Sequence, residues 1–252
     1  MTNNVNYTRI EDLKRLEFID SIISKYDLKK LKVLDVGCGN GNISRYVGAK
    51  GHLVTGIDIS ANAINKAKEL TNLPNVKFRN IPAEKLDSND KFDLIICSEV
   101  IEHLSIPEQV LTTLKKLLNS NGTLIVTVPN GFGPREVLIT KPIQWLKTNK
   151  PEILDSLNKI KSKMGFTGQT IQSDADDLTH VQFFTKKSLS KLVSKHGLKL
   201  VNFDKSNFIE TVFPFSLFTK KSIMLQKLDC KIASILPHYF VSGFMSAWQP
   251  EK

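Results

Sequence analysis

Short apolar runs alternate with helical patterns along the first half of the chain. The runs predict strands at residues 32–36, 53–57, 76–79, 92–97 and 123–128. Between them, apolar positions at three- and four-residue steps predict helices, among them 61–70 behind the N-cap Ser60 and 107–118 before a turn at Gly122. Short strands that are apolar throughout and alternate with helices are typical of a parallel sheet covered on both faces. The pattern therefore predicts a doubly wound α/β fold.

Further elements flank this core. Residues 8–26 predict an amphipathic helix that begins with a Thr8–Glu11 capping box. After residue 130 the rhythm breaks, and residues 131–178 predict an insertion of one or two helices over the carboxyl edge of the sheet. The pattern resumes with Thr185 as N-cap, a helix over 186–196 that Gly197 ends, and a strand over 198–203. An irregular apolar segment, 208–236, precedes a last strand within 239–248.

We therefore expect one domain over residues 1–252, built on a mostly parallel seven-stranded sheet. Its parts are an N-terminal helix (1–30), a core (31–130), the insertion after strand five (131–178) and a C-terminal half with strands six and seven (179–252).

Composition narrows the class of protein. With 252 residues, 41% apolar and 24% charged, the chain is a folded globular protein rather than a disordered one. No apolar run reaches the ~18 residues of a membrane span, and the polar N-terminus is unlike a signal peptide. Cys38, Cys97 and Cys230 are widely spaced, which disfavours a disulfide framework or a structural zinc site. We expect a soluble cytoplasmic protein.

The net charge of +10 is unevenly distributed. Residues 131–252 carry 18 basic and 10 acidic side chains, a net charge of +8, against +2 for residues 1–130. Such asymmetry indicates an anionic partner for the second half, although solvated lysine-rich faces have the same signature.

The strongest chemical signal follows the first predicted strand. There Asp35 precedes a turn with glycines at 37, 39 and 41, and Asp58 ends the second strand. Glycines let the backbone approach a ligand, and an acidic residue after the second strand suits a ribose diol. Position 42 is Asn, so the dinucleotide pattern GxGxxG is absent. The Asp35 carboxylate would repel a pyrophosphate but could hold an ammonium group.

These motifs resemble those of the class I S-adenosylmethionine-dependent methyltransferases, which have a Rossmann-like fold. The resemblance covers residues 31–130 and includes the glycine turn, Asp58, Ala83-Glu84, Phe92 to Ser98 and Gly122 to Val126. It implies that S-adenosylmethionine is the cofactor. It also implies these cofactor-binding residues: Asp35, Gly37, Cys38, Gly39 and Gly41 at the methionine part, Asp58 and Ile59 at the ribose, Ala83 and Glu84 at the adenine, and Ser98. Pro82 stands where many relatives have an Asp that contacts the adenine amine.

Acceptor chemistry is expected after strand four. The segment Glu99-Val-Ile-Glu102-His103 resembles the ubiquinone-pathway O-methyltransferase branch, in which the counterpart of His103 borders the acceptor site. A histidine can act as a general base near neutral pH, and it can equally cap or pack a loop. We take His103 and His180 as the candidate catalytic residues, and O-methylation of a small or lipid-linked acceptor as the expected activity.

Two alternatives remain open. Glu99, Glu102 and His103 would share one face of a helix, and with His180 they could hold Mg²⁺ or Mn²⁺. That set resembles the metal-dependent small-RNA 2'-O-methyltransferases, but the same pattern occurs in metal-independent relatives, so the metal is not our preferred interpretation. The other alternative is a cofactor-binding subunit without transferase activity.

Aromatic and lysine residues gather in the second half. They predict an apolar acceptor pocket or a peripheral membrane contact with an anionic surface, and nucleic acid is the less favoured partner; many of the aromatics are also expected in the core. The residues are Phe132, Trp145, Phe166, Phe208, Phe213, Phe215 and Phe218, with Lys141, Lys147, Lys220, Lys221 and Lys227.

Overall fold

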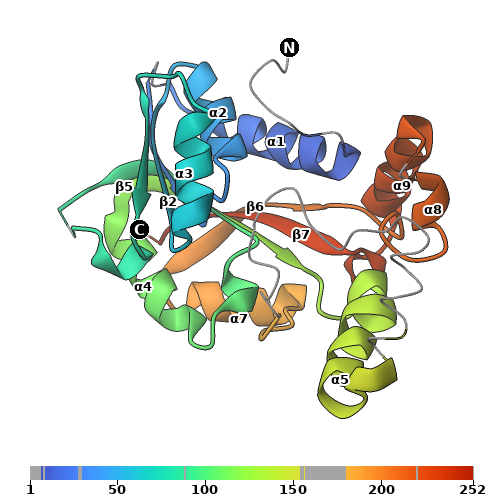
Figure 1. Cartoon of the computed structure of the whole chain (residues 1–252). Helices are drawn as coiled ribbons and strands as arrows, with labels where there is room; N and C mark the ends of the chain where they lie inside the picture. Colours follow the sequence, from blue (N-terminus) through green and yellow to red (C-terminus); the bar gives the residue numbers. More distant parts are fainter. Residues whose placement is uncertain are drawn as a thin grey trace.

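One seven-stranded sheet organises the molecule (Figure 1). The computed structural model describes residues 7, 9–27, 30–87, 89–153, 156, 180–219 and 221–251. Strand order is β3-β2-β1-β4-β5-β7-β6; β7 is antiparallel to both neighbours, and the other adjacent pairs are parallel. The predicted doubly wound, mostly parallel sheet is confirmed. The strands are β1 (Lys32–Val36), β2 (Leu53–Asp58), β3 (Val76–Asn80), β4 (Phe92–Ser98), β5 (Leu118–Pro129), β6 (Leu198–Lys205) and β7 (Gly243–Pro250).

Helices cover both faces of the sheet, as Figure 1 shows. Helices α1, α2 and α3 pack on one face, and α4 and α7 pack on the other. The α-helices are α1 (Ile10–Ile23), α2 (Asn42–Ala49), α3 (Ala61–Glu69), α4 (Pro107–Leu117), α5 (Lys141–Asn149), α7 (Lys186–Ser194), α8 (Ser216–Thr219) and α9 (Ile223–Ile235). Short helical turns are η1 (Ala83–Lys85), η2 (Ile101–His103), the π-helical η3 (Glu136–Thr140) and η4 (His238–Phe240). No described helix has the length and apolarity that a membrane crossing requires.

The core has two layers because side chains alternate along each strand. In β1, Leu34 belongs to the cluster under α4 and α7, whereas Val33 belongs to the cluster under α1 to α3. In β4, Ile95 and Ile96 divide in the same way. Burial on both faces explains why the central strands are apolar throughout.

Several local predictions are confirmed. Ser60 caps α3 by accepting a hydrogen bond from the Ala63 N–H. Thr185 and Ser188 form a reciprocal capping box at α7. Gly197, which follows α7, has a positive φ of 66°.

Other local predictions are wrong. The N-cap of α1 is Arg9 rather than Thr8, which lies outside the described residues; the Arg9 side chain makes no capping hydrogen bond and pairs with Glu11 and Glu210. Gly122 lies inside β5 rather than in a turn, because β5 begins at Leu118 and pairs irregularly with β4 before Thr123. The segment 208–236, expected to be irregular, contains α8 and α9. The last strand is shifted to Gly243–Pro250, and η4 occupies residues 238–240. Residues 154–155 and 157–178 of the predicted insertion, with residue 179 after it, lie outside the described residues.

Candidate active site

Glycine is required in the turn between β1 and α2 by both conformation and packing. Gly41 has φ of 80°, and a Cβ built there would lie 2.5 Å from Cζ of Phe78. Gly37 has φ of 66°, and its Cβ would lie 2.4 Å from a methyl group of Val100. Gly39 also has a positive φ. The predicted tight turn therefore brings bare backbone to the carboxyl edge of the sheet.

Asp58 is held against this turn. Its carboxylate accepts hydrogen bonds from the N–H groups of Gly39 (2.9 Å) and Ser60 (2.8 Å). The neighbouring Ile59 is 74% exposed, so its apolar side chain is open to a ligand. This pair suits a nucleoside, because the carboxylate of Asp58 can bind the ribose diol while the side chain of Ile59 contacts the face of the base or sugar.

The remaining cofactor candidates lie at the same edge. Ala83 is buried and Glu84 exposed in η1, directly after β3. Ser98 ends β4, and its hydroxyl lies 2.8 Å from that of Thr127. Cys38 is buried, which raises the pKa of its thiol and keeps it neutral. The structure thus brings the sequence-predicted cofactor residues together along the ends of β1 to β4.

Asp35 is a fully buried carboxyl group in β1. It accepts a 2.6 Å hydrogen bond from the hydroxyl of Ser44. Burial raises its pKa to about 7, against the lowering effect of Ser44. A cation placed beside Asp35 would favour the ionised form, as expected for the ammonium group of an amino-acid moiety.

Glu99 does not lie with Glu102, His103 and His180, although the sequence predicted that it would. It has a positive φ of 56°, and its carboxylate accepts a hydrogen bond from Thr127 (2.9 Å) and lies 3.6 Å from the guanidinium of Arg15. Within residues 99–103, only residues 101–103 form a helical turn. The prediction that Glu99, Glu102 and His103 share a helical face is therefore wrong.

Glu102, His103 and His180 do come together. One side-chain donor atom from each lies within 4.8 Å of the other two, and the two imidazole rings are 5.0 Å apart. The backbone explains this meeting, since the N–H groups of Val181 and Gln182 both donate to the carbonyl oxygen of Glu102, at 2.8 and 2.9 Å. Two sequence positions almost 80 residues apart are thereby fixed as neighbours.

A buried residue that the sequence analysis missed completes this group. Glu136, the first residue of η3, is 0% exposed, and its carboxylate lies 3.2 Å from Nδ1 of His180. Its other oxygen accepts a hydrogen bond from Thr140 at 3.1 Å. In the sequence, the only signal was a single acidic residue after the glycine-rich turn Gly131–Gly133. We refer to Glu102, His103, Glu136 and His180 as the His–Glu cluster.

Electrostatics in the His–Glu cluster are unusual. Glu102 is 1% exposed, and neither carboxylate oxygen has a hydrogen-bond partner among the described residues. Burial, followed by the charge of Glu99, raises the pKa of Glu102 well above its usual value. Oε1 of Glu102 lies 3.7 Å from Nε2 of His103, too far for a hydrogen bond. A bound cation or an acceptor hydroxyl would satisfy a buried carboxyl group that lacks hydrogen bonds.

A metal ion fits part of this arrangement. One carboxylate and two imidazoles are a donor set suited to Mn²⁺, Fe²⁺ or Zn²⁺ more than to Mg²⁺, which prefers oxygen ligands. Glu99 does not belong to the set. If a metal binds here, Glu102, His103 and His180 would hold it.

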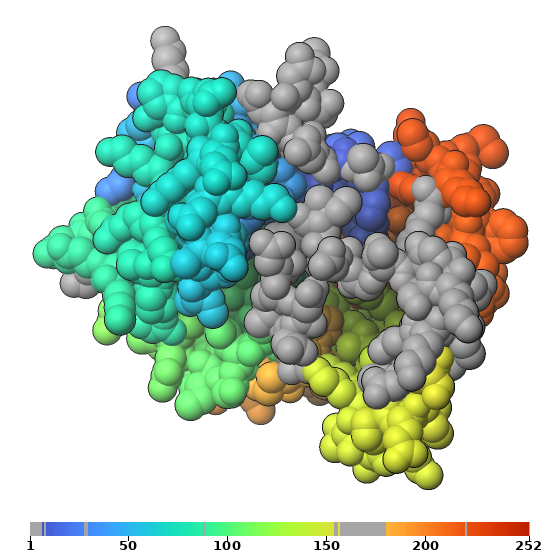
Figure 2. Space-filling view, viewed as in Figure 1, coloured from blue at the N-terminus to red at the C-terminus, as the bar shows by residue number. Residues whose placement is uncertain are grey.

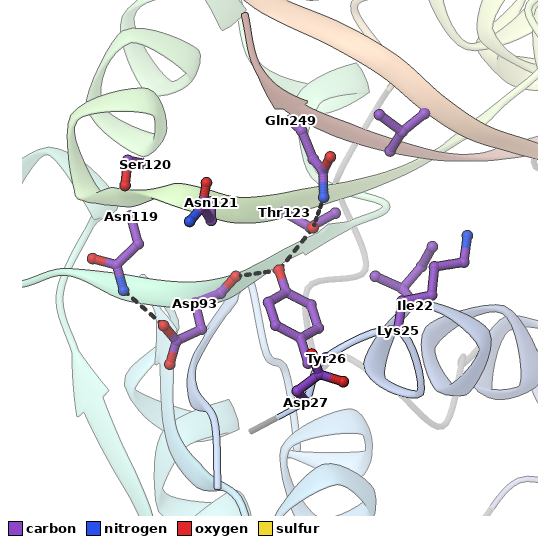
Figure 3. Close-up of a pocket in the computed structure, with 11 residues that line it drawn as sticks. Ile22, Lys25, Tyr26, Asp27, Asp93, Asn119, Ser120, Asn121, Thr123 and Gln249 are labelled. Carbon is purple, nitrogen blue, oxygen red and sulfur yellow. Dashed lines mark hydrogen bonds between the residues drawn. The ribbon is translucent and has the colours of Figure 1, made fainter. Parts of the chain in front are cut away.

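One cavity lies away from this edge. It has a volume of about 640 Å³ and lies among the starts of β4 and β5, the end of β7 and the residues after α1 (Figure 3). Within it, the Tyr26 hydroxyl donates to the carbonyl oxygen of Asp93 and contacts the hydroxyl of Thr123, both at 2.7 Å. These hydrogen bonds hold the segment after α1 against the starts of β4 and β5, at the amino ends of the parallel strands. In parallel sheets, ligands bind at the carboxyl ends of the strands, so this cavity is set apart from the site.

A smaller cleft does lie at the carboxyl ends of β4 and β5. Its lining includes Arg15, Glu99, Thr127 and Arg135. The nearly buried guanidinium of Arg15 pairs with Asp12 and Glu99. Neither arginine was singled out from the sequence, and they give this cleft the means to bind a carboxylate.

A seven-stranded sheet in this order, with a glycine turn after β1 and an acidic residue after β2, is the arrangement of a class I methyltransferase. A family model described as a methyltransferase domain matches residues 9–202. The chain belongs to this family of S-adenosylmethionine-dependent methyltransferases.

Curated relatives match a little under half of the chain. The chain is 38% identical over 121 residues to a ubiquinone biosynthesis O-methyltransferase of Rickettsia akari (strain Hartford), covering 46% of this chain and 48% of that protein. It is 34% identical over 116 residues to the protein of the same description in Glaesserella parasuis serovar 5 (strain SH0165), covering 43% and 49%. The chain thus spans about half the length of the curated relatives it matches.

Solved structures extend the similarity of fold to nearly the whole chain. A 1,6-didemethyltoxoflavin-N1-methyltransferase of Burkholderia thailandensis superposes with a TM-score of 0.58 at 15% identity, covering 97% of this chain and 80% of that one. A magnesium protoporphyrin IX methyltransferase of Synechocystis PCC 6803 gives a TM-score of 0.54 at 17% identity, covering 96% and 84%. At such identities the likeness concerns the fold alone.

Proposed function

We propose that this chain transfers a methyl group from S-adenosylmethionine to an oxygen atom of a small or lipid-linked acceptor, in one domain over residues 1–252. The observation that carries the proposal is the hydrogen-bonded pair of His180 and buried Glu136 beside His103, at the edge where cofactor candidates gather. Curated relatives that match a little under half of this chain are described as O-methyltransferases, which supports oxygen as the acceptor atom.

The cofactor would occupy the ends of β1 to β4. The glycine turn and Asp35 would take the methionine part, Asp58 and Ile59 the ribose, and Ala83 with Glu84 the adenine. Pro82 has no side-chain donor or acceptor, so the adenine amine is left to Glu84 or to backbone groups. Arg15, on α1 beside Glu99, is placed to pair with the cofactor carboxylate.

The His–Glu cluster would act on the acceptor. S-adenosylmethionine supplies a methyl group on a sulfonium, which an oxygen lone pair attacks in line. Nδ1 of His180 donates to the carboxylate of Glu136, which leaves the other ring nitrogen with a lone pair to accept the proton of the acceptor hydroxyl. Glu136 is then a positioning residue, and it stabilises the imidazolium that forms.

The test begins with the acceptor. Labelled methyl donor is offered with pools of quinone-precursor phenols, sugar lipids and RNA, and we expect label in a phenolic or lipid product. His180→Asn should lower kcat by about 10²–10⁴-fold. His196→Asn, which changes a histidine of the turn after α7, is the matched control and should retain full activity.

Glu136 is tested by substitution that keeps its size. We expect Glu136→Gln to lower kcat while KM for the acceptor is unchanged, and Glu136→Asp to recover part of the loss. A full-rate His180→Asn enzyme would contradict the general-base role. If S-adenosylhomocysteine binds tightly but no pool becomes labelled, the chain is better described as a cofactor-binding subunit without transferase activity.

A metal-assisted transfer is the second candidate, and it is favoured by Glu102, whose carboxylate lacks a hydrogen-bond partner among the described residues and lies beside two imidazoles. A metal bound there would act as a Lewis acid on the acceptor hydroxyl. Dialysis against EDTA followed by activity assays with and without Mn²⁺ distinguishes the two candidates. Activity that disappears and returns with Mn²⁺ supports the metal, and unchanged activity supports general-base catalysis. An RNA acceptor would be recognised by binding that weakens steeply with salt.

A further inference from the structure

Helix α9 exposes large apolar side chains while it buries two polar ones. Its buried residues are Gln226, Asp229, Cys230 and Ala233, whereas the outer surface carries large apolar side chains. We define the α8–α9 face as six residues that are each more than half exposed: Phe213, Phe218, Ile223, Met224, Leu228 and Ile235. A surface helix of a globular protein normally buries its apolar stripe, so this face requires an explanation.

The orientation of α9 is fixed by hydrogen bonds on its inner side. The side chain of Gln226 accepts from the N–H of Ile10 at 3.0 Å and donates to the carbonyl oxygen of Thr219 at 2.9 Å. The carboxylate of Asp229 accepts from the N–H groups of Phe208 (2.8 Å) and Ile209 (2.9 Å). Rotating the helix to bury the apolar residues would break all four hydrogen bonds and turn the side chains of Gln226 and Asp229 away from their partners. The apolar face is therefore held outward.

The charged residues of this segment are also divided between the inside and the outside: the acidic ones are buried and the described lysines are exposed. Residues 208–240 contain two acidic residues, Glu210 and Asp229, and both are buried. Lys221, Lys227 and Lys231 are exposed, and the last two lie on the outer side of α9 among the apolar residues. Among the described residues of this segment, the outer surface thus combines apolar and positively charged side chains with no acidic one.

We propose that the α8–α9 face docks on an anionic lipid bilayer, with α9 lying in the plane of the interface. Apolar side chains of such a helix enter the acyl boundary while lysines reach the headgroups. Each lysine near an anionic leaflet adds to the attraction. A second copy of this chain is a poorer occupant, because a self-complementary interface would bring lysines against lysines with no acidic partner.

The position of this face deepens the proposed function, and this step rests on that function. In Figure 1, α8 and α9 lie on the right and α5 lies below them on the same side, and Figure 2 shows the surfaces of the two segments at the upper and lower right. Helix α5 begins directly after η3, which supplies Glu136 to the His–Glu cluster, and it exposes Trp145. Helix α9 contacts α1, which supplies Arg15 to the cleft beside Glu99. Docking here would place the acceptor site next to the lipid surface, as a lipid-linked acceptor requires.

The test measures cosedimentation of the full chain with phosphatidylcholine vesicles that contain or lack phosphatidylglycerol. We expect binding to the anionic vesicles, and a loss of more than about tenfold in affinity for Met224→Gln/Ile235→Gln and for Lys227→Glu/Lys231→Glu. Leu70→Gln is the matched control, since Leu70 is 43% exposed at the C-cap of α3, on the other side of the molecule, and it should bind like the parent chain. Thermal unfolding of each variant checks that the fold is retained.

Three results would overturn the proposal: no binding of the parent chain to anionic vesicles, equal binding by the glutamine pair, or a dimer in solution that the glutamine pair dissociates. Vesicle binding needs neither acceptor nor turnover, so its failure is distinguishable from failure of the proposed methyl transfer. Methylation of a water-soluble acceptor should be unchanged in the glutamine pair.

Discussion

Cofactor binding should be linked to the protonation of Asp35. This carboxyl group is 1% exposed, and burial raises its pKa to about 7, so in the cofactor-free protein roughly half of it is protonated at neutral pH. The ammonium of the cofactor's methionine part requires the ionised form. Binding must then release the proton, and affinity for S-adenosylhomocysteine should rise with pH up to about 7.

The magnitude follows from the pKa. Below pH 7, the apparent affinity should weaken about tenfold for each pH unit, and at pH 6 binding should release about 0.9 protons. Calorimetry with S-adenosylhomocysteine between about pH 5 and 7.5, in buffers of different ionisation enthalpy, measures both quantities; over this range the ligand amine stays cationic. The same group makes the cofactor-free fold less stable as pH rises from about 4 to about 7, because the unfolded chain releases the proton that the fold retains.

Two variants test whether Asp35 is the source of this pH dependence. Asp35→Asn should bind weakly with little dependence on pH. Asp58→Asn, at the residue that we propose to bind the ribose, should bind weakly but keep the pH slope, with the slope beginning at a lower pH because the charge of Asp58 raises the pKa of Asp35. A dissociation constant that is equal at pH 5.5 and 7.5, with no proton release, would refute the assignment of Asp35 as the counter-ion.

Three further predictions concern stability and the His–Glu cluster. Gly41→Ala should lower the free energy of unfolding by at least about 1–2 kcal/mol in urea titrations, because of its positive φ and the contact with Phe78. Trp248→Ala, at a 1% exposed side chain, should cost about 3–5 kcal/mol in the same assay. Because the pKa of Glu102 is raised, the folded parent holds a proton that the unfolded chain releases, and the parent should lose stability as pH rises above the usual pKa of a glutamate. Glu102→Gln should remove this loss. A parent chain whose stability does not fall with pH would contradict the last of these.

The cofactor edge was predictable because its signals are local. The glycine turn, Asp58 and the Ala83-Glu84 pair each follow a strand, and the carboxyl ends of parallel strands meet at one edge whatever the details of packing. Caps such as Ser60 and Thr185 are local in the same sense, because the bond that they make lies within three residues.

The acceptor side was not predictable in the same way, because its geometry depends on single backbone choices and long-range contacts. The positive φ of Glu99 turns its side chain toward Arg15, and no periodicity announces such a residue. Glu136 meets His180 only because β5, η3 and the segment before α7 converge in space. Helix α9 was missed because apolar side chains lie on both its outer and its inner face, and polar Gln226 and Asp229 are among its buried residues, so no single apolar stripe marks it.

The charge asymmetry of the sequence becomes a sharper asymmetry on the folded surface. Net charge counts Glu210 and Asp229 against the lysines of their segment, but both acids are inside, where Arg9 pairs with Glu210 and backbone N–H groups bind Asp229. Burial raises the pKa of Glu210 to about 7, which removes part of even that charge near neutral pH. Because surface attraction depends on the charges that face the partner, the α8–α9 side is more positive than its sequence count. The arrangement of buried acids, rather than an excess of lysines alone, therefore makes this side suited to an anionic surface.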